Sequence, residues 1–350
     1  MISVIGLGNI GSLIASKLSE DNDVVALDTE KKKLDGLRNV KGISGNIMES
    51  ADVIKKSDLV VVALPGQISN LHVKKLLEWG LNVVDVSYSP EDPYDLDKLA
   101  RSTGSLYVPD CGFAPGMSNM LAYNLHSKYE SQDIEIIVGG LPEEAREPFL
   151  HSVTWSVEGL IDEYTRKAKV ISNYNVKSLN PLDEIGSLIL PGLGEFEYFI
   201  SDGLRTLLST LKIRNLSEKT IRIKGHLSKM KVLRDLGYFS DEQIDGTTAR
   251  KLSEHIFSRF RTEERDVCIL IVRSIDSSKS LTMTAKGSSD HSAMSLLTGL
   301  PAVSVSNLII EGSIEGVGMF PPELIAENSK NLSYIIRELT EVGVNFESNT

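Results

Sequence analysis

The chain has 350 residues, of which 41% are hydrophobic and 24% are charged, and its formal net charge is −11. This length is sufficient for two domains, each with its own hydrophobic core. The acidic balance excludes general affinity for nucleic acid, because neutralising phosphates requires clustered Lys and Arg and no basic stripe is present.

The N-terminal segment has the pattern strand, glycine turn, helix, strand. Residues 2–5 form a continuous apolar run, which is typical of a parallel strand buried on both faces. The next six residues, "GLGNIG", complete the motif G-x-G-x-x-G before an amphipathic segment. Such glycines allow a tight turn and close approach of a pyrophosphate, whose charge is stabilised by the helix N-terminus. We therefore predict a dinucleotide-binding turn made of Gly6, Gly8, Asn9, Ile10 and Gly11.

Asp28 ends the next predicted strand, 20 residues after Gly8. An acid at this position accepts hydrogen bonds from the ribose hydroxyls and repels a 2′-phosphate. Thr29 follows it, where NADP enzymes often have Arg, so the pattern favours NAD as the cofactor. Residues 31–33 are all Lys, which leaves NADP open.

Alternation of strands and helices continues to residue 112. Apolar runs at 58–66, 81–88 and 105–112 predict strands, and a helical spacing lies between the first two. This order is typical of a Rossmann-type doubly wound parallel sheet in an α/β fold. Ligands of such sheets bind outside the carboxyl ends of the strands. This rule adds five residues to the predicted cofactor site: Leu64, Pro65, Ser87, Cys111 and Gly112.

Two further residues at this edge are predicted to take part in catalysis. Tyr88 is placed to touch nicotinamide or substrate, and Asp110 could orient a side chain or a water molecule, or only cap a turn. Cys111 is interpreted as a small wall residue, because no partner base for a nucleophile can be identified. Gly112 and Gly116 are expected to let the backbone pass close to nicotinamide and to act as a hinge.

The sequence pattern changes from about residue 123. Apolar runs at 133–140 and 266–275 and an alternating run at 280–287 lie far apart, with helices between them. They predict an inserted α+β domain for substrate binding and dimerisation over residues 123–289. Residues 1–122 and about 290–350 then form the NAD-binding Rossmann domain. We expect a homodimer or a larger homo-oligomer.

Three segments of the second half have helical spacing. Residues 199–211 are predicted as one helix with a leucine-rich face, and residues 228–239 as another that closes at Gly237. Residues 292–312 are predicted as two buried helices broken at Gly299–Pro301.

Only two cysteines occur, Cys111 and Cys268, in no spacing typical of a metal site. They predict neither bound metal nor a disulfide framework, and they fit a reducing compartment. The chain starts at once with "MISVIGLG", so we expect no secretory signal, and no apolar run approaches the roughly 20 residues that span a bilayer. We therefore expect a cytoplasmic protein with no membrane partner, no nucleic-acid partner and a small amino-acid substrate.

Several stretches resemble the saccharopine dehydrogenase-like family and, within it, the L-lysine 6-dehydrogenases. They include "VIGLGNIG", "PDCGFAPGMSNMLA", "VGGLP", "IRIKGHLSKMKVLRDLGYF" and "TGLPAVSVSNLIIEG", in this order. The glycine motif alone is common among dehydrogenases, but the ordered set is specific. The resemblance implies NAD-dependent oxidative deamination of the ε-amine of L-lysine. The product would be allysine, which closes to 1-piperideine-6-carboxylate, with release of ammonia.

One departure helps to choose within the family. Saccharopine-forming reductases tend to have Asp where this chain has Ala114, and they tend to lack the pair Gly225–His226. Both differences favour the lysine 6-dehydrogenases. Saccharopine dehydrogenase or reductase activity and a carboxynorspermidine-type dehydrogenase stay open. The alternative from another class is a catalytically silent NAD-binding regulatory protein.

The implied reaction requires a base near the reacting nitrogen, a cation for the substrate carboxylate and an acceptor for its ammonium. His226 is the predicted base, although packing near the following helix would explain it equally well. Arg205 and Arg222 are the predicted carboxylate ligands, because guanidinium binds a carboxylate through two parallel hydrogen bonds. Asp202 is a predicted substrate ligand that could instead pair locally with Arg205. Trp155 is predicted to form an aromatic wall of the substrate site.

Overall fold

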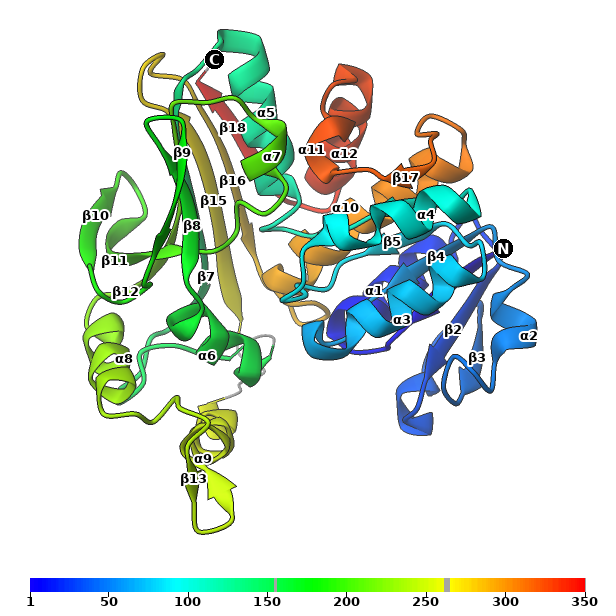
Figure 1. Ribbon diagram of the computed structural model, residues 1–350, viewed down its shortest axis with the longest axis horizontal. Coiled ribbons are helices and arrows are strands. Elements are labelled where there is room, and N and C mark those ends of the chain that lie inside the picture. Colours follow the sequence, from blue (N-terminus) through cyan, green and yellow to red (C-terminus); the bar gives the residue numbers. More distant parts are fainter. Residues whose placement is uncertain (154–155, 261–264, 350) are drawn as a thin grey trace. The chain divides into compact units, whose positions relative to one another are not determined.

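Seven parallel strands form the sheet of unit 1, which comprises Met1–Asn124 and Ser295–Gly343 (Figure 1). The computed structural model describes residues 1–153, 156–260 and 265–349. In chain order the strands are β1 (Ile2–Ile5), β2 (Val24–Asp28), β3 (Val40–Ser44), β4 (Leu59–Val62), β5 (Val83–Asp85), β6 (Leu106–Val108) and β17 (Gly318–Met319). Their spatial order, β17-β6-β5-β4-β1-β2-β3, confirms the predicted doubly wound sheet.

The helices of unit 1 connect these parallel strands, as a right-handed α/β fold requires. They are α1 (Asn9–Leu18), η1 (Lys31–Leu34), α2 (Ala51–Ile54), α3 (Gly66–Glu78), η2 (Pro93–Leu96), α4 (Asp97–Thr103), α11 (Pro322–Ile325) and α12 (Ser329–Glu341). Val73 and Leu76 of α3 and Ala100 of α4 pack with Val60 and Val62 of β4 in one buried cluster. Val60 and Val62 of β4 thus contact helices on this face of the sheet. Burial of the strand explains why its sequence is continuously apolar.

Helix α10 (Ala293–Ile310) is a single helix, so the predicted break at Gly299–Pro301 is wrong. Pro301 lies inside it and removes one helical N–H, but extensive burial outweighs that loss. Gly299 lets the helix approach α1, since a Cβ there would lie 2.7 Å from Leu13 Cδ2. By length and composition alone α10 could cross a membrane, but 72% of it is buried inside the structure, as is usual for a core helix.

Unit 2 comprises Leu125–Met294 and Val344–Thr350 and contains a mixed nine-stranded sheet. The strands are β7 (Asp133–Pro142), β8 (Ala168–Ser172), β9 (Asn175–Leu179), β10 (Gly186–Leu190), β11 (Gly194–Ser201), β12 (Asn215–Ile223), β15 (Asp266–Ser274), β16 (Ser280–Lys286) and β18 (Asn345–Asn349). Strands β12 and β7 are parallel, and the other pairs are antiparallel. The α+β architecture predicted for the second half is confirmed.

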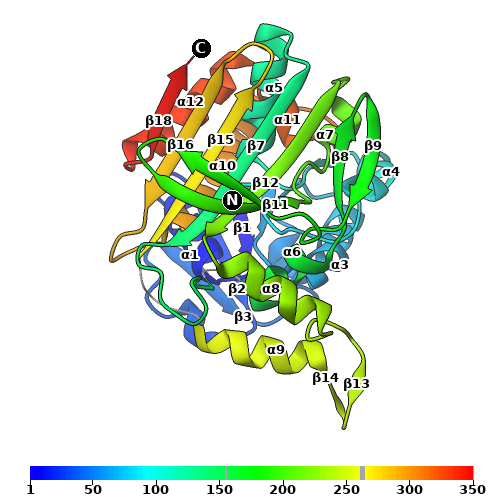
Figure 2. The ribbon, with the colours of Figure 1, turned by 90° about the vertical axis from the view of Figure 1, so that its left-hand side faces the viewer.

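Helices α6 (Val157–Thr165), α8 (His226–Asp235) and α9 (Ala249–Phe257) of unit 2 lie at one end of this sheet (Figure 2). Helix α9 is followed by η3 (Ser258–Phe260); a small hairpin, β13 (Gln243–Ile244) and β14 (Thr247–Thr248), precedes α9. The long helix α5 (Met117–Tyr129) leads into the unit. An aromatic core joins α6 and α8 to the sheet, with Tyr164, Phe199 and Phe257 buried together. Of the residues that the sequence predicted for catalysis, His226 lies against this core.

Two predicted elements of the second half differ from the structure. The predicted helix 199–211 is instead the end of β11, a loop and the short α7 (Leu207–Thr210). Phe199 of β11 pairs with Thr220 of β12, so this part of the segment is a strand. Gly203 and Arg205, whose φ is positive (49°), then prevent a continuous helix before α7. The extreme C-terminus was assigned to the Rossmann domain, but β18 pairs with β16 and so belongs to unit 2. The alternation within "NFESN" is too polar to reveal an edge strand.

Replacing Asp266 should destabilise unit 2, because its carboxylate caps the N-terminus of α10. Oδ1 accepts a hydrogen bond from the Ala293 N–H (2.6 Å), and Oδ2 accepts one from the Met294 N–H (3.0 Å). Asp266 is fully buried, so alanine would leave two buried donors without partners. We expect Asp266→Ala to lower the free energy of unfolding by about 3 kcal/mol, measured by urea titration. Asp290→Ala, at an exposed aspartate in the loop before α10, is the control; equal losses in both variants would contradict the capping role.

Candidate functional site

The three glycines of the turn after β1 have different surroundings. Gly6 has a φ of 91°, and a Cβ there would lie 2.4 Å from the Ala63 carbonyl oxygen. A Cβ on Gly11 would lie 1.8 Å from the Gly6 carbonyl oxygen. A Cβ on Gly8, by contrast, would meet nothing within 4 Å. The fold itself therefore requires Gly6 and Gly11, whereas Gly8 leaves open space at the start of α1.

The start of α1 is suited to an anion. No side chain caps this helix at Gly8, and its first turn contains no acidic residue. The N–H groups of a first helical turn have no partners within the helix, and the helix dipole favours negative charge there. Gly8 and Asn9 are exposed, and Ile10 is half-buried. The predicted turn thus offers backbone donors and space to a pyrophosphate.

Asp28 lies at the end of β2 and holds the turn in place. Its Oδ2 accepts a hydrogen bond from the Leu7 N–H (2.7 Å), and its Oδ1 accepts one from the Glu30 N–H (2.8 Å). Lys33 Nζ lies 3.6 Å from the same carboxylate, and the Glu30 and Asp28 carboxylates together raise the pKa of Lys33. A ribose at this position would therefore meet an acid and a cation side by side, as the run of lysines in the sequence left open.

The carboxyl ends of β4, β5 and β6 bring together further predicted cofactor residues. The Leu64 N–H donates a hydrogen bond to Ser87 Oγ (3.3 Å), and the Cys111 N–H donates one to the Asp85 carbonyl oxygen (2.8 Å). Asp85, which the sequence analysis missed, also accepts a hydrogen bond through Oδ1 from the Ser87 N–H (2.9 Å). The sequence pattern that could have identified Asp85 is an acidic residue at the end of an apolar strand. Pro65, the residue before α3, lies at the same edge.

Residues 110–117 form a tight loop rather than an open hinge. The Met117 N–H donates to the Gly112 carbonyl oxygen (2.9 Å), and a Cβ on Gly116 would lie 2.1 Å from that oxygen. The two glycines are therefore required because they approach each other, a reason that the sequence analysis did not foresee. Asp110 is 3% exposed and has a φ of 50°, so its carboxylate lies inside the fold at the end of β6. Tyr88 is half-buried after β5.

Cys111 should resist alkylation in the folded protein. The thiol is fully buried, and burial raises its pKa, with the Asp110 and Asp85 carboxylates adding to the effect. Because the thiolate is the reactive form, Cys111 has no nucleophilic character. We expect no iodoacetamide adduct at Cys111 in native protein at pH ~8 by mass spectrometry, and complete labelling in denaturant. Rapid labelling of Cys111 without denaturant would show an activated thiol instead.

In unit 2, His226 is part of a buried hydrogen-bonded chain. Its Nδ1 lies 2.7 Å from the Phe149 carbonyl oxygen, which can only accept, so Nδ1 carries the proton. Its Nε2 then accepts from the Tyr164 hydroxyl (2.8 Å), and Tyr164 Oη accepts from Arg222 Nε (3.2 Å). His226 is 0% exposed, and burial lowers its pKa to about 3. The acceptor nitrogen of His226 is occupied and the residue is buried in the core, so the geometry favours the packing interpretation, and a role as base would require Tyr164 to move away from Nε2.

Arg222 is also held by the protein. It is 3% exposed, donates to the Ile221 carbonyl oxygen and forms an ion pair with Glu163 of α6. Its guanidinium points from β12 toward α6, and burial with these partners leaves little access for a substrate carboxylate. Glu163 is the counter-charge of this arginine. The predicted substrate contact of Arg222 therefore requires a rearrangement of α6.

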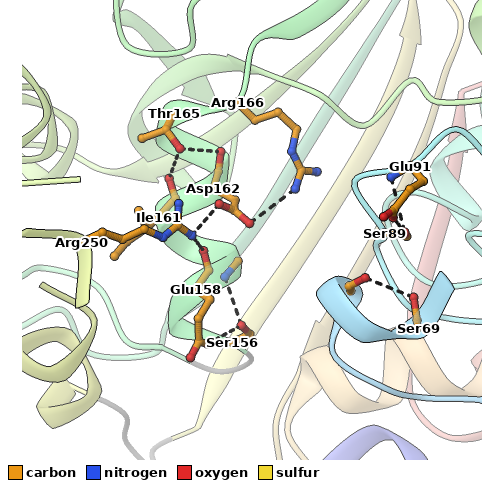
Figure 3. Close-up of polar contacts among 12 residues, drawn as sticks. Ser69, Ser89, Glu91, Ser156, Glu158, Ile161, Asp162, Thr165, Arg166 and Arg250 are labelled. Atoms are coloured by element: carbon orange, nitrogen blue, oxygen red, sulfur yellow. Dashed lines mark hydrogen bonds and ion pairs between the residues drawn. The ribbon is translucent and has the colours of Figure 1, made fainter. Parts of the chain in front are cut away.

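Asp162, another acid of α6, is ion-paired as well (Figure 3). Asp162 lies 2.6 Å from Arg250 Nη2 and 3.5 Å from Arg166 Nη2. The Ser156 hydroxyl caps the helix by accepting from the Gly159 N–H (3.1 Å). Trp155, the predicted aromatic wall, lies outside the described residues.

Arg205 and Asp202 lie in the loop between β11 and α7, not on one helix. Arg205 is half-buried, and Asp202 Oδ1 accepts from the Lys169 N–H (3.2 Å). Beneath this loop lies Glu218 of β12, which no sequence signal marked because its strand reads as a simple alternation. Glu218 is 3% exposed, and its Oε1 accepts from Ser201 Oγ (2.8 Å). Arg205 is thus the predicted substrate cation that the structure leaves closest to solvent.

Two protein families match this chain, one over its N-terminal residues and one over most of the remainder. The saccharopine dehydrogenase C-terminal domain family matches residues 112–344, more than half of the chain. The chain belongs to the saccharopine dehydrogenase family. Residues 1–88, which include the glycine turn, match the family described as NADP oxidoreductase, coenzyme F420-dependent. The resemblance seen in the sequence is therefore confirmed at the level of the family.

Individual members of the saccharopine dehydrogenase family are distant in sequence. The chain is 20% identical to the mitochondrial alpha-aminoadipic semialdehyde synthase of Mus musculus, over 92% of this chain and 45% of that protein. It is 22% identical to the L-glutamate-forming, NADP(+) saccharopine dehydrogenase of Pyricularia oryzae, over 70% of this chain and 59% of that protein. The chain thus spans about half the length of the curated relatives it matches.

The fold of this family member is shared with a solved structure. The apo saccharopine dehydrogenase (L-Glu forming) of Saccharomyces cerevisiae superposes with a TM-score of 0.80 at 16% identity, covering 100% of this chain and 99% of that chain. The likeness covers the whole chain and shows that this chain has the fold of the yeast protein.

Proposed function

We propose that the chain is an NAD(P)-dependent oxidoreductase that cleaves the C–N bond of saccharopine, giving L-glutamate and α-aminoadipic semialdehyde. The observation that carries this proposal is the open anion-binding turn at Gly8, in a chain whose relatives act on or form these compounds by name. These relatives favour saccharopine over free L-lysine, the substrate that the sequence analysis preferred. A nicotinamide cofactor, when bound, would supply the hydride acceptor.

Saccharopine and L-lysine would undergo the same bond changes. The carbon that bears the amine loses hydride, and the nitrogen lone pair forms the C=N bond of an imine. Water then adds to the imine carbon, and the C–N bond breaks to leave an aldehyde and the free amine, with release of a proton. An ammonium cannot support the first step, so the substrate nitrogen must be deprotonated before hydride leaves. The proposed proton carriers are Tyr88 and Asp110, because they follow β5 and β6 at the edge of the sheet where the cofactor is expected.

The proposed roles of the other residues follow from the two units. The turn of Gly6, Gly8 and Gly11 binds the pyrophosphate, and Asp28 with Lys33 faces the adenosine ribose. The close approach of a cation to Asp28 is compatible with NADP as well as NAD, so the preference for NAD stays a prediction. Arg205 binds a substrate carboxylate from its loop in unit 2.

L-Lysine 6-dehydrogenation is the second candidate, favoured by Ala114. A neutral side chain stands there where saccharopine-forming relatives tend to have Asp. The two substrates differ only in the glutaryl group on the nitrogen, which adds two carboxylates. A site for saccharopine therefore needs more positive charge than a site for lysine, whose ε-amine is unsubstituted.

The test is reduction of NAD and of NADP, followed by absorbance, with saccharopine or L-lysine as substrate. We expect reduction with saccharopine and formation of L-glutamate in equal amount, detected by chromatography. Reduction with lysine and release of ammonia, but no turnover of saccharopine, would replace the main proposal by the second candidate. No reduction with any combination, in protein that binds a dinucleotide, would favour the catalytically silent regulator.

A further inference from the structure

A buried carboxyl group supports the loop of residues 202–206 in unit 2, and neither the proposed reaction nor the core accounts for it. This group is Glu218 of β12, whose side chain points to the same side of the sheet as Ser201 of β11. Ser201 Oγ donates to Glu218 Oε1 (2.8 Å) and in turn accepts from Thr220 Oγ1 (2.7 Å). Glu218 Oε2 is buried and has no hydrogen-bond partner among the described residues.

Gly203 covers this carboxyl group directly. A Cβ on Gly203 would lie 2.1 Å from both carboxyl oxygens of Glu218, so the loop backbone itself closes the space around them. Two residues later, Arg205 has a φ of 49°, in a region that non-glycine residues rarely adopt. The loop is therefore packed tightly on Glu218 and held in an unfavourable backbone conformation, which makes it poised to move as a unit.

The charges around Glu218 oppose its ionisation. Asp202 in the loop and Glu163 of α6 both disfavour a second negative charge at this position, and burial adds the larger effect. Arg222, four residues further along β12, is already paired with Glu163. Burial raises the pKa of Glu218 to about 7. For an ionised Glu218, the single hydrogen bond from Ser201 would offset little of the hydration that burial removes. A neutral carboxylic acid loses less hydration and needs fewer hydrogen-bond donors.

We propose that Glu218 is a proton-linked latch: the closed loop 202–206 holds its carboxyl group neutral, and opening of the loop hydrates that group and releases its proton. Lifting Gly203 exposes Oε2 to water, which supplies the donors that the closed loop lacks. The inference goes beyond the proposed reaction and does not depend on it. Because the loop carries Asp202 and Arg205, substrate binding in this unit would become linked to the same proton.

The direction of the pH effect follows from the two states. The closed loop raises the pKa of Glu218 above the usual value of 4.5, to about 7, and the open loop restores it. Between these values the open state has lost the proton and the closed state has kept it. The opening equilibrium should therefore rise about tenfold for each pH unit in this window and become constant above it.

The experiment is amide hydrogen exchange of the peptide containing residues 202–206, measured from pH 5 to 8.5 and corrected for intrinsic exchange. We expect wild-type protection to fall about tenfold per pH unit up to pH ~7 and then to level off. Glu218→Gln, which stays neutral with nearly the same shape, should show pH-independent protection. Glu195→Gln, at an exposed glutamate of the adjacent strand, is the matched control and should behave as wild type.

Two outcomes would overturn the latch. Constant protection in the wild-type protein across this range would exclude coupling between the loop and any proton, whether or not the variants fold. An equal pH dependence in wild type and in Glu218→Gln would assign the proton to another group. Glu218→Met, which is neutral and of similar length, serves in place of Glu218→Gln if the amide disturbs the packing at Ser201, and the same two results apply to it. None of these readouts requires a substrate or a cofactor.

Discussion

Gly8→Val should abolish dinucleotide binding while leaving the protein folded. The φ and ψ of Gly8 are −69° and −173°, which any residue adopts, and its Cβ position is empty. A valine side chain would occupy the space that a pyrophosphate needs above the first turn of α1. We expect the Kd for NAD and for NADP to rise at least about 100-fold, or about 2.8 kcal/mol, by isothermal titration calorimetry.

The control for this change is Ser16→Val, which adds the same side chain on the exposed face of the same helix. It should leave the Kd unchanged. Both variants should unfold at urea concentrations close to that of the wild type. A Cβ at Gly8 meets no atom within 4 Å, and Ser16 is exposed to solvent. Retention of wild-type affinity in Gly8→Val would place the dinucleotide, if it binds at all, somewhere other than this turn.

His226→Ala should unfold unit 2 far more readily than wild type. The change removes a ring packed edge-on against Phe149 at 5.1 Å, takes away the acceptor of the Tyr164 hydroxyl proton and leaves the Phe149 carbonyl oxygen without the donor Nδ1–H. We expect a loss of about 4 kcal/mol in the free energy of unfolding, from the cavity and the unsatisfied groups together. Urea titration at neutral pH measures it, with His255→Ala at an exposed histidine of α9 as the control.

The pH dependence of stability distinguishes this structural role further. Burial lowers the pKa of His226 from 6.5 to about 3, so the folded state resists protonation that the unfolded state accepts. The contribution of His226 is complete above pH 6.5 and is lost as the pH falls toward 3. The wild type should therefore lose more stability on acidification than His226→Ala does. Parallel curves for the two proteins would show that folding does not change the pKa of His226.

Most of the first unit could be predicted from the sequence, because its signals are local. Most of its strands are apolar runs, and "GLGNIG" predicts both the turn and the helix start. Strands β3 and β17 were missed, because the edge strand β3, "VKGIS", is partly exposed and not continuously apolar, and the two residues Gly318–Met319 carry no periodicity. The break predicted at Pro301 is wrong because a local breaker is overridden when the whole helix is buried.

The second unit could be predicted only in outline. The loop of Gly203 and Arg205 was taken for a helix because leucines at helical spacing continue across it, whereas pairing of Phe199 with Thr220 fixes a strand. His226 was taken for a base because a histidine after a glycine is compatible with either role. Only the three-dimensional neighbours Phe149 and Tyr164 decide between them, and they lie far away in the chain.

The most direct test of the proposed function is transfer of a labelled hydrogen. Saccharopine carrying deuterium on the carbon that becomes the aldehyde would be incubated with the protein and NADP, or NAD, and the reduced cofactor analysed by mass spectrometry. The account predicts deuterium in the reduced nicotinamide and aldehyde that has lost one label. Reduced cofactor that contains no deuterium would contradict hydride transfer from this carbon. Loss of the deuterium from the substrate to water would contradict it as well.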